Sequence, residues 1–357
     1  MQFNKIKLKD IADINMGQSP SGSSYNNNGR GIPFLQGNKT FGFLYPTIDT
    51  WTTEPKKIGK RNSVLMSVRA PVGDLNIANK DICIGRGLCS IEMKNGNNQY
   101  LYYLLKNSIK KIKMKSTGTV FDSINRKELE NIEILDFNKS QQKKISKVLF
   151  DIDKKIELNT QTNDNLLKIG LELLKEDFNK KTEYEVLSNV IKFVKGKKPS
   201  DITHELKEGY KKYLTIACLN GQEVNYADPT KMVLANNDLL MVMDGASSGE
   251  VYYGGQGLVG STLSRVDCID GKYISEFIYF IMKYYKDLIQ SKNTGSAIPH
   301  TDRVFVGNLK VPKLLIDEQE KYKILQNINE NETLEQLRDT LLPKLMNGEI
   351  DLDKIEI

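Results

Sequence analysis

Residues 141–178 most constrain the fold, because they contain no proline and a single glycine, Gly170. A seam of positions recurs here in alternating steps of four and three, the pattern of a long helix that packs against a partner helix. The seam consists of Ile145, Leu149, Ile152, Ile156, Asn159, Asn163, Leu166, Gly170 and Leu173. At 1.5 Å per residue this helix is roughly 55 Å long. Because packing supplies most of a helix's stability in water, we expect another element to cover the seam.

The polar positions of the seam leave two interpretations open. Asn159, Asn163 and a later asparagine, Asn331, either disfavour slipped registers between paired helices or face solvent. Gly170 either lets a second helix approach closely or allows a bend in the first. The sequence does not decide between these alternatives.

The segments that flank this helix repeat the same motifs in the same order, at offsets of 175 to 179 residues. The corresponding stretches are Gly17–Pro20 with Gly196–Pro199, Asn62–Met66 with Asn237–Met241, Arg69 with Gly245, Ser123 with His300, and Ser140–Lys144 with Asp317–Lys321. A second helical pattern follows the last match over 317–347, and its seam is Ile324, Ile328, Asn331, Leu334, Leu337 and Leu341. The chain is therefore interpreted as a tandem duplication of a globular domain and a long helix.

This organisation predicts an α/β (α+β) fold with four segments. The first domain covers residues 1–140, the central helix 141–183, the second domain 184–316, and the C-terminal helix and tail 317–357. We expect the two helices to pair as an antiparallel coiled coil between the domains, in a pseudo-twofold arrangement. In the first domain, composition and turn signals predict strands at 32–36, 63–68, 82–91 and 131–137, and a helix at 100–115.

The charge of the chain is unevenly distributed. The whole chain has a net charge of +6, whereas residues 1–140 carry +9 and residues 317–357 carry −6. This distribution favours a polyanion as the partner of the body and a protein as the partner of the tail. The alternative is a soluble protein with an unevenly charged surface.

Other features narrow the class of protein. The four cysteines form no C-x-x-C pair and have no histidine at ligand spacing, so we expect free thiols in a reducing cytoplasm and no metal site. No signal peptide is recognisable at the start, and no apolar run approaches membrane-spanning length. We therefore expect a cytoplasmic protein without a membrane partner.

Catalytic motifs are missing from the sequence. It contains no P-loop, no H-E-x-x-H and no Asn/Asp-Pro-Pro-aromatic motif of the kind found in amino-methylating enzymes. Gly85-x-Gly87 is typical of a turn rather than of a nucleotide cradle. Of the two histidines, His204 and His300, the latter lies opposite Ser123, which excludes a duplicated catalytic histidine.

The loops offer side chains suited to reading DNA, since Arg and Lys pair with guanine, and Asn and Gln with adenine. In the first domain the candidates are Gln18, Ser19, Gln36, Asn38, Lys39, Arg61, Arg69 and Arg86. In the second they are Lys197, Lys198, Asn220, Gln222, Ser247 and Ser248. Residues at matched places in both domains, which either contact phosphates or shape the loops, are Lys115, Thr117, Arg126, Lys292, Thr294 and Arg303. Each one alone is also compatible with an ordinary solvated surface residue.

Several of these motifs resemble the specificity subunit of type I restriction-modification systems. The resemblance rests on Leu8-x-Asp10-Ile11, Gly17–Pro20, Gly31–Gly37, Ser67–Gly73, Gln141–Ile145 and the ending Leu337–Ile350. It covers essentially the whole chain in order. The second domain departs most, with Asp244-Gly245-Ala246-Ser247 in place of Val68-Arg69-Ala70-Pro71.

The resemblance implies that two target-recognition domains each read half of a split site on double-stranded DNA. It also implies that the paired helices act as a ruler and docking platform for two modification subunits. Restriction subunits complete the complex, and S-adenosylmethionine, ATP and Mg²⁺ belong to the partners, so this chain has no catalytic residues or cofactor of its own. Two rival hypotheses are a DNA-modifying enzyme, either a methyltransferase or a nuclease, and a coiled-coil protein adaptor.

Overall fold

A computed structural model describes residues 4–116, 123–221, 223–269, 271–295, 298–323 and 328–352. The chain splits into two compact units. Unit 1 comprises Met1–Leu158 and Glu330–Ile357, and unit 2 comprises Asn159–Asn329. Thr117, Gln222 and Ile324, which the sequence singles out, lie outside the described residues. No helix among the described residues is long and apolar enough to cross a membrane.

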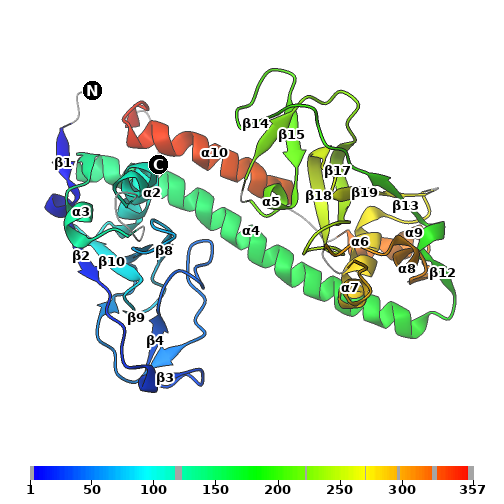
Figure 1. Ribbon diagram of the computed structural model, residues 1–357, viewed down its shortest axis with the longest axis horizontal. Coiled ribbons are helices and arrows are strands. Elements are labelled where there is room, and N and C mark those ends of the chain that lie inside the picture. Colours follow the sequence, from blue (N-terminus) through cyan, green and yellow to red (C-terminus); the bar gives the residue numbers. More distant parts are fainter. Residues whose placement is uncertain are drawn as a thin grey trace. The chain divides into compact units, whose positions relative to one another are not determined.

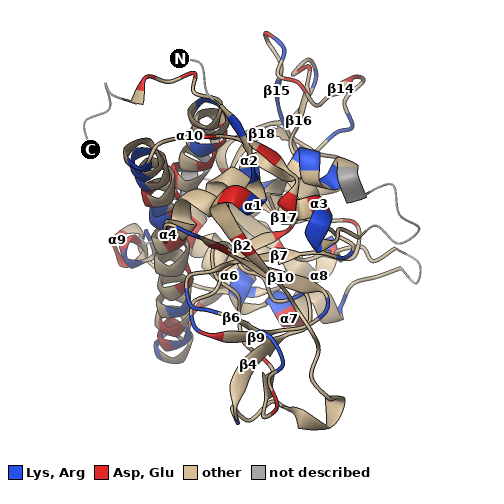
Figure 2. Ribbon diagram, turned by 90° about the vertical axis from the view of Figure 1, so that its left-hand side faces the viewer, with Lys and Arg blue, Asp and Glu red and all other residues tan. Residues whose placement is uncertain are grey.

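The predicted central helix is confirmed as α4 (Lys139–Lys180), which is 42 residues long and contributes to both units. Asn138 and Gln141 close its start, because each side chain accepts a hydrogen bond from the other's backbone N–H. This reciprocal arrangement satisfies amide groups that have no partner within the helix. Figure 2 shows that basic and acidic residues alternate along α4, as expected for a helix that keeps one face in water.

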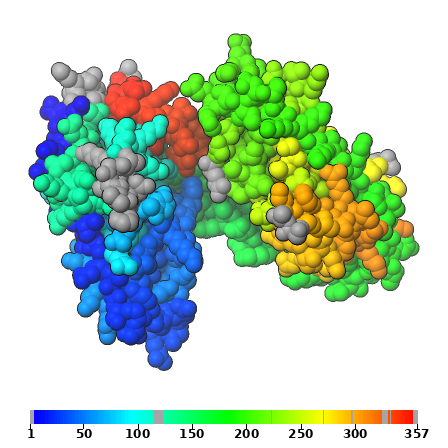
Figure 3. Space-filling view, in the orientation of Figure 1, coloured from blue at the N-terminus to red at the C-terminus, as the bar shows by residue number. Residues whose placement is uncertain are grey.

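In unit 1 the helix α10 (Ile328–Met346) runs antiparallel to the first half of α4. Asn331 donates a hydrogen bond to the Ile156 carbonyl, and Lys144 donates to the Leu352 carbonyl near the other end of the pair (Figure 1). Asn331 therefore contacts its partner helix rather than solvent alone. In the surface view this red C-terminal helix lies against cyan segments of the same unit (Figure 3).

The prediction of one continuous helix over 317–347 is wrong. The structure has α9 (Ile316–Gln319), the 3₁₀ helix η3 (Glu320–Tyr322) and α10 as separate elements. The helix ends at Lys323, whose ψ of 39° lies outside the helical region. The physical reason is that Tyr322 is fully buried in unit 2 and its hydroxyl is tied to Asp177, whereas α10 packs in unit 1.

The described residues of unit 1 form three small sheets, with strand orders β2-β10-β7-β8, β3-β5-β4-β9-β6 and β1-β11. Its strands are β1 (Lys5–Lys7), β2 (Ala12–Met16), β3 (Tyr25–Asn26), β4 (Ile32–Leu35), β5 (Trp51–Thr52), β6 (Ile58–Gly59), β7 (Val64–Ser67), β8 (Leu75–Ile77), β9 (Ile82–Ile84), β10 (Leu88–Met93) and β11 (Glu133–Leu135). Its short helices are α1 (Leu8–Ile11), η1 (Gly22–Ser24) and α3 (Arg126–Glu130). β1 pairs with β11.

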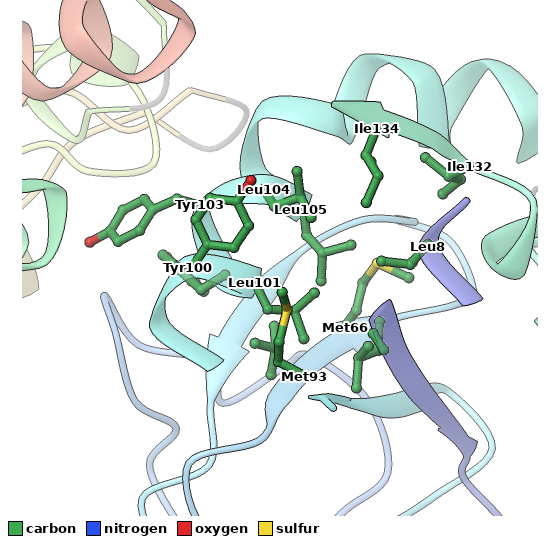
Figure 4. Close-up of a cluster of buried hydrophobic side chains, with 14 of the residues drawn as sticks. Leu8, Met66, Met93, Tyr100, Leu101, Tyr103, Leu104, Leu105, Ile132 and Ile134 are labelled. Atoms are coloured by element: carbon green, nitrogen blue, oxygen red, sulfur yellow. The ribbon is translucent and has the colours of Figure 1, made fainter. Parts of the chain in front are cut away.

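The core of unit 1 lies between the first sheet and the helix α2 (Asn98–Ser116). Tyr100, Leu101 and Leu104 on α2 lie over Met66 and Met93 of the sheet (Figure 4). These α2 positions recur at helical spacing, which is why the sequence predicts this helix correctly. The predicted strand over 82–91 is wrong, because Gly85–Gly87 divide it into β9 and β10.

Unit 2 contains a seven-stranded sheet with the order β13-β19-β17-β18-β15-β16-β14. Its strands are β12 (Tyr184–Val186), β13 (Ile191–Lys195), β14 (Ile202–Thr203), β15 (Lys211–Leu214), β16 (Asn225–Ala227), β17 (Leu234–Val242), β18 (Val251–Val259), β19 (Leu263–Cys268) and β20 (Lys310–Pro312). Its remaining helices are η2 (Leu187–Asn189), α5 (Ile216–Leu219), α6 (Ser275–Tyr284), α7 (Lys286–Ser291) and α8 (Arg303–Gly307). β12 pairs with β20, as β1 pairs with β11 in unit 1.

The close-approach interpretation of Gly170 is confirmed. A Cβ atom at this position would lie 2.2 Å from the Phe280 ring, which belongs to α6. Phe280 is fully buried in the core of unit 2. Gly170 therefore lets the second half of α4 pack directly against α6.

Candidate nucleic-acid interface

The loop that starts at Gly17 in unit 1 is held by the backbone of two neighbouring strands. Gly17 N–H donates to the Leu88 carbonyl at 2.9 Å, and Gln18 N–H donates to the Ile84 carbonyl at 2.9 Å. A Cβ at Gly17 would lie 2.1 Å from the Gly85 carbonyl oxygen, so a larger residue cannot occupy this position without displacing backbone. Glycine is thus required by close approach and not by an unusual dihedral angle.

Unit 2 repeats this arrangement bond for bond. Gly196 N–H donates to the Leu263 carbonyl at 2.9 Å, and Lys197 N–H donates to the Val259 carbonyl at 3.0 Å. A Cβ at Gly196 would lie 2.1 Å from the Gly260 carbonyl oxygen. The duplication inferred from the sequence is therefore confirmed at the level of single hydrogen bonds.

The parallel strand pairs beneath these loops also correspond. In unit 1, Leu35 of β4 pairs with Ile84 of β9, and in unit 2, Leu214 of β15 pairs with Val259 of β18. The sheet differs only in continuity, since β18 is one long strand where unit 1 has the separate strands β8 and β9. The two units thus present their loops from the same framework.

Four predicted residues of unit 1, Gln18, Ser19, Gln36 and Arg86, lie at the ends of these strands. Ser19 Oγ donates to Gln36 Oε1 at 2.9 Å and accepts a hydrogen bond from Arg86 N–H at 3.2 Å. Gln18, Gln36 and Arg86 are exposed, and Ser19 is half-buried. Backbone contacts also fix this cluster, because Gly87 N–H donates a hydrogen bond to the Gln36 carbonyl.

Arg69 extends the same edge of unit 1. Val68 N–H donates to the Gly87 carbonyl at 2.9 Å, and Arg69 forms an isolated β-bridge with Ser123. Arg69 is exposed. We call the surface formed by Gln18, Ser19, Gln36, Arg69 and Arg86 the unit 1 edge.

Other predicted residues of unit 1 lie in different places. Asn38 donates to Asp74 Oδ2 at 2.6 Å, which ties together two loops, and Lys39 next to it is exposed. Arg126 begins α3, and its guanidinium pairs with Glu130 at 2.7 Å. Lys115 lies in the last turn of α2.

Arg61 does not belong to the unit 1 edge. It precedes β7, whereas Arg69 follows that strand, and its backbone N–H bonds to Asp81 just before β9. The strand therefore separates Arg61 from the unit 1 edge, and a contact of Arg61 with DNA stays a prediction. An α/β sheet with short strands places the two ends of each strand on opposite sides, a relation that composition does not reveal.

In unit 2 the corresponding loops carry different side chains. Lys197 and Lys198 are exposed, and Lys197 Nζ donates to the Lys231 carbonyl at 2.9 Å. Asn220 follows α5 and accepts a hydrogen bond from the Tyr252 hydroxyl at 2.9 Å. Ser247 is half-buried.

Ser248 is fully buried and does not reach the surface. Its hydroxyl oxygen lies 2.6 Å from the Gly245 carbonyl oxygen and 2.8 Å from the Pro299 carbonyl oxygen, and these two acceptors share its single hydrogen. Asn293 completes the arrangement by donating to the Ser248 carbonyl. The prediction that Ser248 contacts DNA is therefore replaced by a role in holding two loops together.

The remaining predicted residues of unit 2 lie on the loops that follow α7. Lys292, Thr294 and Arg303 are exposed. Thr294 and His300 form an isolated β-bridge through reciprocal backbone hydrogen bonds. Arg303 is the first residue of α8, which Asp302 caps through two backbone N–H groups.

The backbone pairing corrects one correspondence between the units. The bridge of Arg69 with Ser123 in unit 1 is matched in unit 2 by a bridge of Asp244 with His300. Asp244, and not Gly245, therefore occupies the place of Arg69. Between Asp244 and Gly249, unit 2 contains one residue more than unit 1 contains between Arg69 and Gly73. An ungapped comparison of the two sequences therefore does not align Asp244 with Arg69.

Ser261 of unit 2 occupies the place of Arg86 in unit 1. The glycines that precede them, Gly85 and Gly260, make equivalent backbone hydrogen bonds, which aligns the two residues. Asp244, His300 and Ser261 were not among the predicted contacts. The offset between corresponding residues of the two domains is 176 at Gly73 and Gly249 but 175 at Asn62–Met66 and Asn237–Met241. This change in offset is the sequence signal that could have identified Asp244.

A polar hollow of about 480 Å³ lies beside these loops in unit 2. Its lining includes Asn220, Ser247 and Tyr252, together with Glu250 and Lys283. Burial would raise the pKa of the Glu250 carboxyl, but hydrogen bonds from Lys283 and Lys286 outweigh it and lower the pKa. Two of the predicted contacts thus line one hollow, which also contains a fixed ion pair.

Within the described residues, no group of three or more His, Cys, Asp or Glu side chains is placed to hold a metal ion. Three cysteines, Cys83, Cys89 and Cys218, are buried, and Cys268 is half-buried. Burial raises the pKa of the Cys89 thiol to about 12, which keeps the thiol protonated at neutral pH.

Comparison with known proteins gives consistent results. A protein of Methanocaldococcus jannaschii described as "Putative type I restriction enzyme MjaX specificity subunit" is 43% identical over 157 residues. These residues are 43% of this chain but only 37% of that relative, and the match to the MjaVIII specificity subunit of the same organism spans 35% of its length. The MjaIX specificity subunit is 23% identical over 407 residues, covering 98% of this chain and 94% of the relative.

A solved structure shows the same fold. The crystal structure of a type I restriction-modification system S subunit from M. genitalium aligns with a TM-score of 0.61 at 19% identity. The alignment covers 97% of this chain and 96% of the other. The family model of the type I restriction modification DNA specificity domain matches residues 2–168 and again residues 179–342. The two matches confirm the predicted α/β duplication, and the chain belongs to the type I restriction modification DNA specificity domain family.

Proposed function

We propose that this chain reads double-stranded DNA for a type I restriction-modification complex, and that each unit reads one half of a split, asymmetric site. The observation that carries this proposal is that matching backbone hydrogen bonds in the two units hold loops with different side chains. Gly17 and Gly196 anchor the same loop, yet the loop continues with Gln18-Ser19 in unit 1 and Lys197-Lys198 in unit 2. A shared scaffold with changed contacts is what two different half-sites require.

The chemistry of the unit 1 edge suits base recognition. Arg69 and Arg86 are donors that pair with guanine in the major groove, and Gln18 and Gln36 pair with adenine. Residues 1–140 carry a net charge of +9, which favours contact with a phosphate backbone. The backbone around Ser19 is fixed by hydrogen bonds, so the loops that carry these groups are already ordered before DNA binds, which lowers the entropic cost of binding.

The helix α4 would set the number of unread base pairs between the half-sites. It runs over 42 residues and belongs to both units, and at 1.5 Å per residue it is about 63 Å long. Buried carboxylates at Asp153 and Asp177 fix its packing within each unit. A continuous, anchored helix is stiff enough to act as a spacer.

The proposed partners supply the chemistry. Two modification subunits would methylate adenine with S-adenosylmethionine, and restriction subunits would use ATP and Mg²⁺ for translocation and cleavage. This chain would direct them to the site and carry out no catalytic step itself. The names of its relatives as specificity subunits support this division of labour.

A methylation assay separates this proposal from a DNA-modifying enzyme. The purified chain would be incubated with S-adenosylmethionine and duplex DNA, with and without its modification subunits. We expect methylation of the DNA only when this chain and its modification subunits are present together. Methyl transfer by the chain alone would refute the non-catalytic role.

The salt dependence of DNA affinity separates the proposed DNA-reading function from that of a protein adaptor. For about six phosphate contacts, affinity for DNA falls by about a thousandfold between about 50 and 200 mM salt. We expect a steep decline of this kind for the complex on its own site. An affinity that does not change with salt would count against phosphate contacts and favour the adaptor.

A further inference from the structure

The two units carry opposite charges at one structurally equivalent position. Val68 N–H donates to the Gly87 carbonyl in unit 1, and Met243 N–H donates to the Thr262 carbonyl in unit 2. The next residue in each unit, Arg69 or Asp244, then forms the isolated β-bridge described above. Backbone geometry alone therefore makes Asp244 the counterpart of Arg69.

Asp244 is held in a fixed orientation. Its Oδ1 atom lies 2.7 Å from His300 Nδ1, and the side chains of Asp244 and His300 are 31% and 50% exposed. The backbone on both sides is tied down as well, because Gly245 N–H donates to Pro299 and Thr301 N–H donates to Met243. The carboxylate is thus preorganised and still reaches solvent through its remaining lone pairs.

The two side chains have complementary hydrogen-bonding abilities. A guanidinium only donates, so Arg69 matches the O6 and N7 acceptors of guanine, whereas a carboxylate only accepts. The base edge that offers a donor to a carboxylate in the major groove is the N4 amino group of cytosine. A carboxylate on a surface that faces phosphates is otherwise repelled, so a carboxylate at this place favours a base contact.

We propose that Asp244 is a specificity-determining residue that accepts a hydrogen bond from cytosine N4 in the half-site read by unit 2, with His300 as its positioning residue. This inference rests on the proposed DNA-reading function. It assigns to Asp244 a role equivalent to the one proposed for Arg69 toward guanine in the other half-site. Sequence pairing of Arg69 with Gly245 cannot suggest this role.

The first test uses the wild-type complex with its modification subunits. Methylated sites are mapped genome-wide by single-molecule sequencing, and the half-site of unit 2 is identified by exchanging residues 184–316 for those of another family member. We expect at least one G·C pair in that half-site whose substitution lowers affinity about ten- to hundredfold. A unit 2 half-site without any G·C pair would overturn the inference even if no variant were made.

The second test uses Asp244→Asn, with His300→Ser as a matched variant that introduces the residue of unit 1. We expect Asp244→Asn to shift the preferred base at one position of one half-site from cytosine toward adenine, because Asn pairs with adenine. His300→Ser should weaken discrimination at the same position without changing the preferred base. A merely structural pair would instead lower affinity equally at all positions, and that result, or an unchanged site, would refute the role of Asp244.

The outcome also distinguishes the inference from the function on which it rests. A split wild-type site with no position that depends on Asp244 removes only the inference. A wild-type complex that shows no split site removes the proposed function and the inference together.

Discussion

Replacing Arg338 with alanine should destabilise unit 1 strongly, because this residue neutralises a buried charge between two helices. Arg338 on α10 donates to Asp153 on α4 at 2.8 Å, and the Tyr103 hydroxyl on α2 donates to the same carboxylate at 2.7 Å. Asp153 is fully buried and the Arg338 side chain is only 10% exposed. Burial alone would lower the pKa of Arg338, but its hydrogen bonds to Asp339 and Asp153 outweigh it and raise the pKa above its usual value.

The magnitude follows from what each substitution leaves behind. Removing one partner of a buried ion pair costs about 3–5 kcal/mol. Lys106 lies 4.0 Å from Asp153 and compensates in part, so we expect a loss of about 3 kcal/mol for Arg338→Ala. Tyr103→Phe removes one hydrogen bond to a charged group and should cost less, about 1.5–3 kcal/mol.

Urea denaturation of the full chain, followed by far-UV circular dichroism, measures these losses. The transition of unit 1 should move to lower urea and that of unit 2 should not, since each unit has its own core. Lys180→Ala, which breaks an exposed ion pair with Glu176, is the control and should leave both transitions unchanged. A loss below about 1 kcal/mol for Arg338→Ala would refute the reasoning, because a buried carboxylate that loses its main charged partner should cost more than this.

Three further predictions follow. Gly170→Ala should destabilise unit 2 by about 1–3 kcal/mol through its clash with Phe280, whereas Gly22→Ala, which meets nothing within 4 Å, should not change the denaturation midpoint. The pKa of the Glu250 carboxyl in the folded protein lies below its ordinary value of 4.5. The ionised carboxylate therefore stabilises unit 2 fully above pH 4.5, and this stabilisation is lost as the pH falls through the lower pKa of the folded protein. Glu250→Gln should lower the free energy of unfolding at pH 7 and have a smaller effect near pH 3, which urea denaturation at the two pH values would measure. Inserting seven helical residues after Leu158 and before Glu330 should lengthen the unread spacer by about three base pairs, because seven residues add about 10 Å; methylation mapping that finds changed half-sites and the old spacer would contradict it.

The sequence predicts regular, repeated features well. The seam of α4 is visible because apolar residues recur at helical spacing, and the duplication is visible because glycines such as Gly17 and Gly196 must be retained where backbones touch. The choice between the two interpretations of Gly170 needed the position of Phe280, which comes from a distant segment. Local pattern carries no information on such contacts.

Most errors of prediction arose where tertiary contacts override a local pattern. The helical periodicity over 317–347 continues through Lys323, but the hydrogen bond between Tyr322 and Asp177 ends the helix in unit 2. Ser248 has the composition of a polar loop residue, yet two carbonyl oxygens bury its hydroxyl. Asp244 was missed because one inserted residue shifts the alignment of the two units, and the backbone pairing shows which residue takes the place of Arg69.

The central claim, that each unit reads one half-site, is tested most directly by exchanging residues 184–316 for those of another family member and mapping methylated bases genome-wide. The complex would be assembled with its own modification subunits, and the wild-type map would serve as the reference. Our account predicts that one half-site changes while the other half-site and the spacer are retained. A change in both half-sites, or in neither, would contradict it.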